Sequence, residues 1–211
     1  MSELFDFDKK NKKAKFLIGT DEAGRGPLAG PVVAAAVVFK KLTNKVKSEL
    51  ELLNDSKKLT PKKREALYDI IIKHSIYSIK EVDVETIEKI NILQSALLAM
   101  KLACEEVASQ LDGKYEVFVD GNKKIPNFDS KQTPIIKGDA TSASVAAASI
   151  LAKVYRDRLM DKLDEEFPFY SWKKNKGYGT KAHIDAIKEY GITVYHRESF
   201  LKKFKNEDNN T

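Results

Sequence analysis

Three short apolar runs in this chain each lead into an acid that lies close to a glycine, and this repeated pattern constrains the fold. The runs and their acids are Phe16–Thr20 with Asp21, Glu116–Val119 with Asp120, and Pro134–Ile136 with Asp139. Runs of this length and composition are typical of buried strands. In an open α/β sheet, the functional crevice lies at the carboxyl ends of the strands. If these three strands lie side by side, the acids converge on one small volume, and Glu22 joins them.

The rest of the chain predicts two further strands and four helices. Thr60 and Pro61 are typical of a helix start, with threonine as the cap and proline in the first position. Asn91 indicates a break within a long helix. The predicted strands are Pro31–Phe39 and Ser75–Val82, and the predicted helices are 60–74, 83–111, 142–167 and 181–190. We therefore predict an α/β domain with a central five-stranded mixed sheet flanked by helices, plus a C-terminal helical segment.

The chain shows no internal repeat and no interior linker, so we predict one domain at residues 16–200. Residues 1–15 carry a run of lysines, and we expect them to form a basic, mobile N-terminal segment. Residues 201–211 are expected to be a polar tail. These boundaries leave a core domain long enough to bury a sheet and several helices.

The composition excludes disordered, disulfide-linked and membrane-spanning classes of protein. Hydrophobic residues make up 42% and charged residues 32% of the 211 residues. Cys104 is the single cysteine, so no internal disulfide can form, and we expect a cytoplasmic location. The longest apolar stretches, such as Val32–Phe39, are too short to cross a bilayer. The net charge of +6 and the clustered lysines favour a polyanionic partner. We expect a monomer.

Acids gathered at one sheet edge indicate a site for hard divalent cations. Carboxylates at close range repel one another unless cations lie between them. Oxygen ligands without paired histidines or cysteines suit Mg²⁺ or Mn²⁺ better than Zn²⁺. Two such ions promote in-line phosphodiester displacement, because one activates the attacking water and the other stabilises the leaving oxygen. The alternative for any single acid is a local role, in which it caps a helix or ends a strand.

Six segments resemble bacterial ribonuclease HII, in family order, across about residues 16–200. They are 21–36 (DEAGRGPLAGPVVAAA), 54–60 (NDSKKLT), 119–122 (VDGN), 137–139 (KGD), 147–154 (AASILAKV) with Arg156 and Asp157, and 176–180 (KGYGT). The resemblance implies a ribonuclease H-like fold. It also implies hydrolysis of RNA in RNA–DNA hybrids and nicking 5′ to ribonucleotides embedded in duplex DNA, leaving 3′-hydroxyl and 5′-phosphate ends.

By motif position, the resemblance also implies individual residue roles. The metal-binding and catalytic carboxylates would be Asp21, Glu22, Asp120 and Asp139, holding Mn²⁺ or Mg²⁺. Gly24-Arg25-Gly26 would read the ribonucleotide that precedes a deoxynucleotide, and Tyr178 would pack on the sugar of that deoxynucleotide. These roles are physically reasonable because the 2′-hydroxyl alone distinguishes RNA from DNA locally. An aromatic ring beside a 2′-carbon would be crowded by a hydroxyl.

Four further residues carry weaker predictions. Lys57 and Lys58 lie in a predicted loop and are candidates for binding backbone phosphate. Asp157 is expected to pair with a basic neighbour on its own helix. His183 is expected to have a surface or helix-capping role, because the three histidines show no metal-ligand spacing.

Three alternatives remain open at this point. Ribonuclease HIII shares the Asp-Glu-Ala-Gly-Arg-Gly segment, but it typically carries glutamate at the fourth acidic position and an added N-terminal domain. A non-catalytic nucleic-acid-binding module would keep the lysines and lose the acids. A small-molecule phosphatase would keep the acids, but would give no reason for so many lysines.

Overall fold

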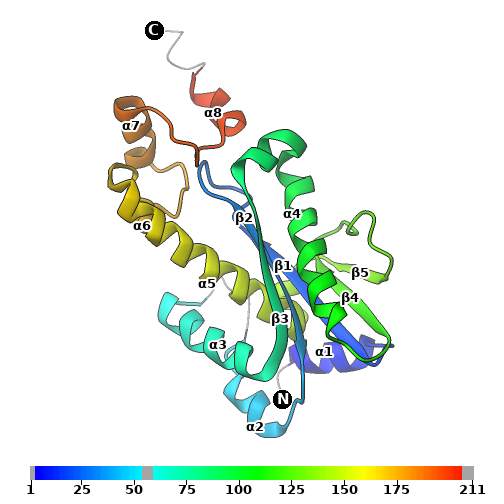
Figure 1. Ribbon diagram of the computed structural model, residues 1–211. Helices are drawn as coiled ribbons and strands as arrows, with labels where there is room; N and C mark the ends of the chain where they lie inside the picture. Colours follow the sequence, from blue (N-terminus) through cyan, green and yellow to red (C-terminus); the bar gives the residue numbers. More distant parts are fainter. Residues whose placement is uncertain (1–2, 54–58, 206–211) are drawn as a thin grey trace.

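The computed structural model describes residues 3–53 and 59–205, and its centre is a five-stranded sheet of order β3-β2-β1-β4-β5 (Figure 1). The strands are β1 (Phe16–Ala23), β2 (Val32–Phe39), β3 (Ser75–Val82), β4 (Tyr115–Asp120) and β5 (Lys131–Ile135). Strands β1, β2 and β3 pair antiparallel, whereas β1, β4 and β5 pair parallel. This arrangement confirms the predicted mixed sheet, and it places the three acid-bearing strands side by side.

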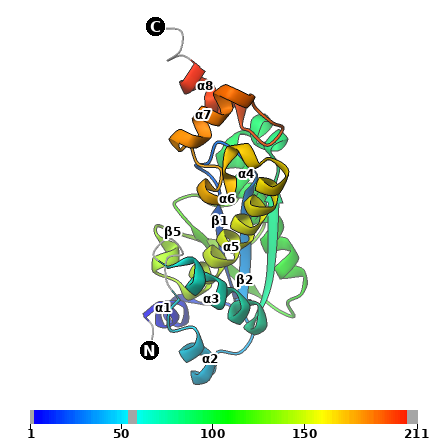
Figure 2. The same cartoon turned by 90° about the vertical axis from the view of Figure 1, so that its left-hand side faces the viewer.

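Helices cover both faces of this sheet. One face packs against α4 (Val84–Ser109), and the other packs against α5 (Ala143–Glu166), α3 (Pro61–His74) and α1 (Glu3–Asn11) (Figure 1). Helices α1 and α2 lie at one end of the molecule, and helices α7 and α8 lie at the opposite end (Figure 2). The remaining helical segments are α2 (Asn44–Glu49), η2 (Gly138–Ala140), η3 (Pro168–Tyr170), α6 (Trp172–Asn175), α7 (Lys181–Tyr190) and α8 (Glu198–Lys205). In the part of the chain that the structure describes, no helix is both long and apolar enough to cross a membrane.

The predicted helix start at Thr60 and the predicted break at Asn91 are both confirmed. The Thr60 side chain accepts a hydrogen bond from the Lys63 amide, and Pro61 is the first residue of α3. Asn91 has a φ of 65°, and its side-chain oxygen accepts from the amides of Leu93 and Gln94. The second half of α4 therefore begins with its own cap.

Strand β1 packs closely against α5. Gly19 faces the first turn of this helix, where a Cβ on Gly19 would lie 2.2 Å from the carbonyl carbon of Ser144. The buried face of α5 is rich in alanine, as in Ala146-Ala147-Ala148. Small residues on both sides let the two backbones approach, so α5 lies directly on the strand that carries Asp21.

The prediction of a mobile segment at residues 1–15 is wrong for residues 3–11, which form α1. Leu4, Phe5 and Asp8 are buried on one face of this helix. Asp8 Oδ1 accepts from the Ser142 hydroxyl at 2.5 Å, and Asp8 Oδ2 accepts from the Ser144 amide at 2.8 Å. The burial of this helix depends on contacts with the start of α5, which lies 134 residues or more further along the chain.

The predicted start of the polar tail is also too early. Helix α8 extends through Lys205, and the Leu201 side chain is buried. The tail therefore does not begin at 201, and residues 206–211 lie outside the described residues.

We expect Asp8→Ala to destabilise the protein by about 1–3 kcal/mol, because it leaves the amide and hydroxyl groups at the start of α5 without their acceptor. Urea unfolding measures this change. Asp6→Ala is the matched control, since Asp6 is exposed on the same helix. Equal unfolding free energies for the two variants would contradict this anchoring role for Asp8.

Candidate active site

Three carboxylates meet at the carboxyl ends of β1 and β4. Strand β1 is longer than predicted and includes both Asp21 and Glu22, while Asp120 is the last residue of β4. The two strands are parallel neighbours, with Thr20 opposite Val119. Carboxylate oxygens of the three acids all lie within 4.8 Å of one another. Asp21 is only 4% exposed, whereas Glu22 and Asp120 are partly exposed.

Asp139, the fourth predicted acid, lies beside this group without being part of it. It is buried in η2, which begins three residues after the last residue of β5. The amide of the preceding Gly138 donates to Asp120 Oδ1 at 2.7 Å. The structure therefore brings three of the four acids together and links the segment that carries the fourth to one of them.

The electrostatics of the cluster favour a cation. Burial raises the pKa of Asp21 well above its usual range, and repulsion from Glu22 and Asp120 adds to this effect. A hydrogen bond with Ser149 and a bond from the Glu22 amide to Asp21 Oδ1, at 2.7 Å, oppose it. Burial also raises the pKa of Glu22, although Arg25 opposes the shift through an ion pair at 3.1 Å. An all-oxygen set of crowded carboxylates fits Mg²⁺ or Mn²⁺.

A cleft of about 660 Å³ begins at Glu22 and contains the other predicted substrate-binding residues that the structure describes. Gly24, Arg25 and Gly26 form part of its wall, and Tyr178 forms another part. Tyr178 is 47% exposed, and its Cε1 lies 3.4 Å from the position that a Cβ on Gly26 would occupy. Lys57 and Lys58 lie outside the described residues.

Gly24 is required at the bend where β1 leaves the sheet. Its φ is 96°, a conformation that side chains rarely adopt, and a Cβ here would lie 2.1 Å from Arg156 Nε. The strand therefore turns against a buried arginine before it reaches Arg25. Only glycine lets the backbone pass this close to the Arg156 side chain.

Arg197 holds the same loop from the other side, and the sequence did not indicate this role. It is fully buried and donates to the carbonyl oxygens of Gly24, Arg25, Pro27 and Gly30, at 2.7–3.2 Å. Burial lowers its pKa to about 9, so the guanidinium stays charged at neutral pH. Nothing in the local sequence separates this arginine from a surface one, since arginine is usually exposed.

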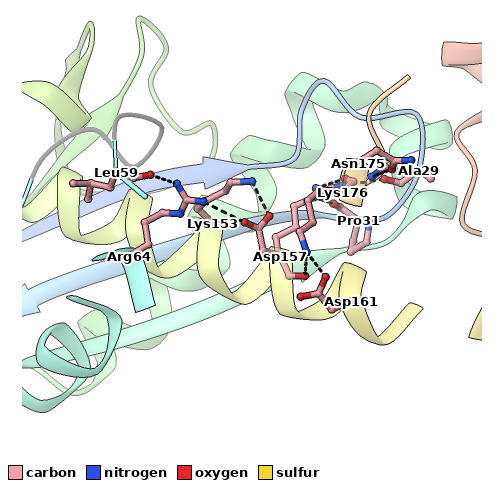
Figure 3. Close-up of polar contacts among 11 residues, drawn as sticks. Ala29, Pro31, Leu59, Arg64, Lys153, Asp157, Asp161, Asn175 and Lys176 are labelled. Carbon is pink, nitrogen blue, oxygen red and sulfur yellow. Dashed lines mark hydrogen bonds and ion pairs between the residues drawn. The ribbon is translucent and has the colours of Figure 1, made fainter. Parts of the chain in front are cut away.

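Arg156 ties this loop to the segment that carries Tyr178. Its guanidinium donates to the carbonyl oxygens of Ala29, Pro31 and Lys176, at 2.9–3.0 Å (Figure 3). Burial lowers its pKa to about 10, which still leaves it charged at neutral pH. From the sequence, this arginine was noted only beside Asp157 in one of the matching segments. Instead, it joins two loops that lie far apart in the chain.

The prediction of a surface or capping role for the His183 side chain is wrong. His183 is fully buried, and its Nε2 accepts from Trp172 Nε1 at 3.0 Å and lies 3.1 Å from His196 Nε2. Because Nε2 accepts, Nδ1 carries the proton and donates to the Tyr178 carbonyl at 3.0 Å. Burial lowers the pKa of both histidines, that of His196 to about 4. The neutral pair thus fixes the backbone of Tyr178.

Asp157 forms the helix ion pair that the sequence predicted. Its carboxylate lies 2.6 Å from Lys153 Nζ on α5 and 3.8 Å from Arg64 Nη2 on α3 (Figure 3).

Cys104 is buried, as expected for a residue on the inner face of a helix.

Comparison with known proteins places this fold and site in a family. Residues 18–205 match the family model described as Ribonuclease HII. The chain belongs to the ribonuclease HII family. It is 55% identical over 202 residues to the ribonuclease HII of Fusobacterium nucleatum subsp. nucleatum, and the alignment covers 95% of this chain and 90% of that relative. It is 51% identical over 201 residues to the ribonuclease HII of Caldicellulosiruptor bescii, with coverages of 94% and 93%.

Solved structures agree with membership of the ribonuclease HII family. Ribonuclease H2 from Pyrococcus horikoshii OT3 superposes with a TM-score of 0.70 at 25% identity, over 93% of this chain and 100% of that one. The ribonuclease HII in a PCNA complex from Archaeoglobus fulgidus superposes with a TM-score of 0.69 at 26% identity, over 86% of this chain and 93% of that one. The predicted ribonuclease H-like fold is therefore confirmed, and the chain is a ribonuclease H endonuclease. The ribonuclease HIII, phosphatase and non-catalytic alternatives are set aside.

We expect Asp21→Asn to stabilise the metal-free protein, because asparagine keeps the acceptor for the Glu22 amide and removes a buried charge. A gain of about 1 kcal/mol would raise the melting temperature by roughly 2–4 °C in EDTA. Because the pKa of Asp21 is raised in the folded protein, the cost of its carboxylate is absent below the unfolded pKa of 3.8 and grows as the pH rises toward the folded pKa. The difference between variant and wild type should therefore shrink as the pH is lowered from about 8 toward about 4. A variant that is less stable than wild type across this range would contradict the electrostatic account.

We expect Arg197→Lys to loosen the Gly24–Gly30 loop, because one ammonium cannot replace a fork that reaches four carbonyls. The cost should be about 2–4 kcal/mol of unfolding free energy. Hydrogen exchange of the loop amides should accelerate beyond the global effect. Lys202→Met, an exposed residue on α8, is the control. Unchanged exchange in the Arg197 variant would show that the loop is held by other contacts.

Proposed function

We propose that this chain hydrolyses the RNA strand of RNA–DNA hybrids and nicks duplex DNA 5′ to embedded ribonucleotides, leaving 3′-hydroxyl and 5′-phosphate ends. One observation carries the proposal. Glu22, whose carboxylate clusters with those of Asp21 and Asp120, lines the same cleft as Gly24-Arg25-Gly26 and Tyr178. The groups proposed for hydrolysis therefore adjoin those proposed to contact the sugar.

Asp21, Glu22, Asp120 and Asp139 would hold divalent cations, Mg²⁺ or Mn²⁺. Two such ions supply an activated water and charge stabilisation at the leaving oxygen during phosphodiester hydrolysis. Bst-RNase HIII was solved in complex with Mn²⁺, although at 17% identity its likeness to this chain concerns the fold alone. The proposal for this chain rests on its own crowded carboxylates and on the raised pKa of Asp21.

The chain's own groups would select the cleavage position. Main-chain groups of Gly24 and Gly26 can approach a 2′-hydroxyl, which both donates and accepts hydrogen bonds. Arg25 would contact phosphate, since it is exposed on the cleft wall beside these glycines. The Tyr178 ring would pack on the next sugar and favour deoxyribose there. The two buried arginines and the histidine pair keep these loops in register.

The proposed partners are RNA–DNA hybrids and ribonucleotide-containing duplex DNA, bound by a monomer in the cytoplasm. The net charge of +6 supports a polyanionic partner. The buried, reduced Cys104 is consistent with a reducing compartment. Phosphate binding by Lys57 and Lys58 stays a prediction.

The test offers a DNA duplex with one ribonucleotide, together with Mg²⁺ or Mn²⁺. We expect a nick 5′ to that ribonucleotide, and a loss of roughly 10²–10³-fold or more in rate for Asp120→Asn, since charge stabilisation at the reacting group is removed. We expect Tyr178→Ala to lower the preference for the ribonucleotide–deoxynucleotide junction by about 10-fold. Tyr190→Ala, at an exposed tyrosine outside the cleft, is the control. An intact wild-type duplex would refute the proposal, and full activity of Asp120→Asn would refute the metal assignment.

A further inference from the structure

Tyr178 lies between two glycines, Gly177 and Gly179, in a short turn between two helices. Within this turn, the Tyr178 amide donates to the Asn175 carbonyl at 2.9 Å, and the Tyr178 carbonyl accepts from the Thr180 amide at 2.8 Å. Gly177 has a φ of 83°, and glycine leaves a backbone free to adopt other conformations. A contact from outside the turn therefore adds a constraint on the tyrosine that the turn itself lacks.

That contact comes from His183, whose ring orientation is fixed by a row of hydrogen bonds. Trp172 Nε1 can only donate, so His183 Nε2 accepts from it and Nδ1–H donates to the Tyr178 carbonyl. His196 Nδ1 accepts from the Thr193 amide at 2.9 Å. The proton of neutral His196 therefore lies on Nε2, which faces His183 Nε2 at 3.1 Å. One protonation pattern satisfies every bond in this row, so the ring of His183 has one orientation.

The segment that carries the second histidine of this pair also holds the glycine loop. The Gly30 amide donates to the Tyr195 carbonyl at 2.8 Å, and the Leu28 carbonyl accepts from the Arg197 amide at 2.8 Å. On its other side, the Leu28 amide donates to the Gly177 carbonyl at 2.8 Å. The loop and the tyrosine turn are thus bonded to each other, and both are bonded to one C-terminal segment.

The spacing between the loop and the tyrosine matters because a junction consists of two adjacent sugars. Tyr178 Cε1 lies 3.4 Å from the position that a Cβ on Gly26 would occupy, so the two groups proposed to contact these sugars are close neighbours. A displacement of about 1 Å is enough to misalign groups that must meet a substrate together. Contacts that fix the tyrosine can therefore decide how well a junction is recognised.

We infer that His183 is a positioning residue for junction recognition, which fixes Tyr178 against the Gly24–Gly26 loop. Trp172 and His196 orient its ring. This inference rests on the proposed function of the site. His183 is fully buried and does not line the cleft, so its effect on the substrate passes through the tyrosine.

The test compares a DNA duplex that contains one ribonucleotide with a duplex of continuous RNA on DNA. The ratio of the two kcat/KM values is the junction preference. His183→Leu removes the donor to Tyr178 and should lower this ratio by about 3- to 10-fold. His183→Asn keeps a donor near the place of Nδ1 and should restore most of the ratio. Ile187→Ala, a partly buried residue on the same helix, is the matched control, and should lower stability without changing the ratio.

A double-mutant cycle and a spectrum separate positioning from a purely structural role. If His183 acts through the tyrosine ring, His183→Leu should lower the junction preference of wild type and leave that of Tyr178→Ala unchanged. Long-range ¹H–¹⁵N NMR of the wild type needs no substitution, and should show His183 protonated at Nδ1 and His196 at Nε2. A His183 protonated at Nε2 would overturn the inference even if His183→Leu folds poorly.

The inference fails if His183→Leu keeps the wild-type junction preference, or lowers it equally with and without the Tyr178 ring. The same duplexes in EDTA, measured by fluorescence anisotropy, give the binding preference without catalysis. An inactive wild type whose binding preference for the junction falls in His183→Leu would overturn the proposed hydrolysis and leave the positioning role standing. An active wild type with an unchanged ratio in His183→Leu would do the reverse.

Discussion

The close contact between β1 and α5 determines where the functional groups of this protein lie. At Gly19 the strand backbone lies against the first turn of the helix, and a single Cβ would collide with Ser144. Asp21 follows two residues later on the same strand, so its distance from α5 is set by this contact. The hydrogen bond between Asp21 and Ser149 is a direct consequence. A longer side chain at position 19 would separate the layers and the acid from its partner.

Further along, the same helix supplies the groups that position the loops above the sheet. Arg156 on α5 contacts the loop after β1 and the segment before Tyr178, and Arg197 contacts the loop after β1 from the C-terminal side. Carbonyl oxygens in loops need partners when they are buried, and these two arginines provide many of them. The loops that form the cleft walls are therefore held in place by buried charges as well as by apolar packing.

Local sequence predicted the parts of the site that depend on local geometry. Asp21 and Asp120 follow apolar runs, so their place at the carboxyl ends of strands could be inferred from the sequence. That these two strands are neighbours was only a condition of the prediction, and the structure meets it. Arg197 could not be predicted in this way, because its partner Gly24 lies 173 residues earlier in the chain. His196 and the helix α1 were missed for the same reason, since their burial depends on segments that are distant in sequence.

Helix α5 carries two groups of opposite character at neighbouring turns. Ser149 hydrogen-bonds to Asp21, whose pKa is raised by burial and by repulsion from Glu22 and Asp120. Lys153 lies one turn later, and burial lowers its pKa although Asp157 opposes the shift. Both shifts disfavour the charged form of the group, so holding these charges costs the protein stability. A helix is stiff over two turns, so the spacing between the acids and this lysine is a property of α5.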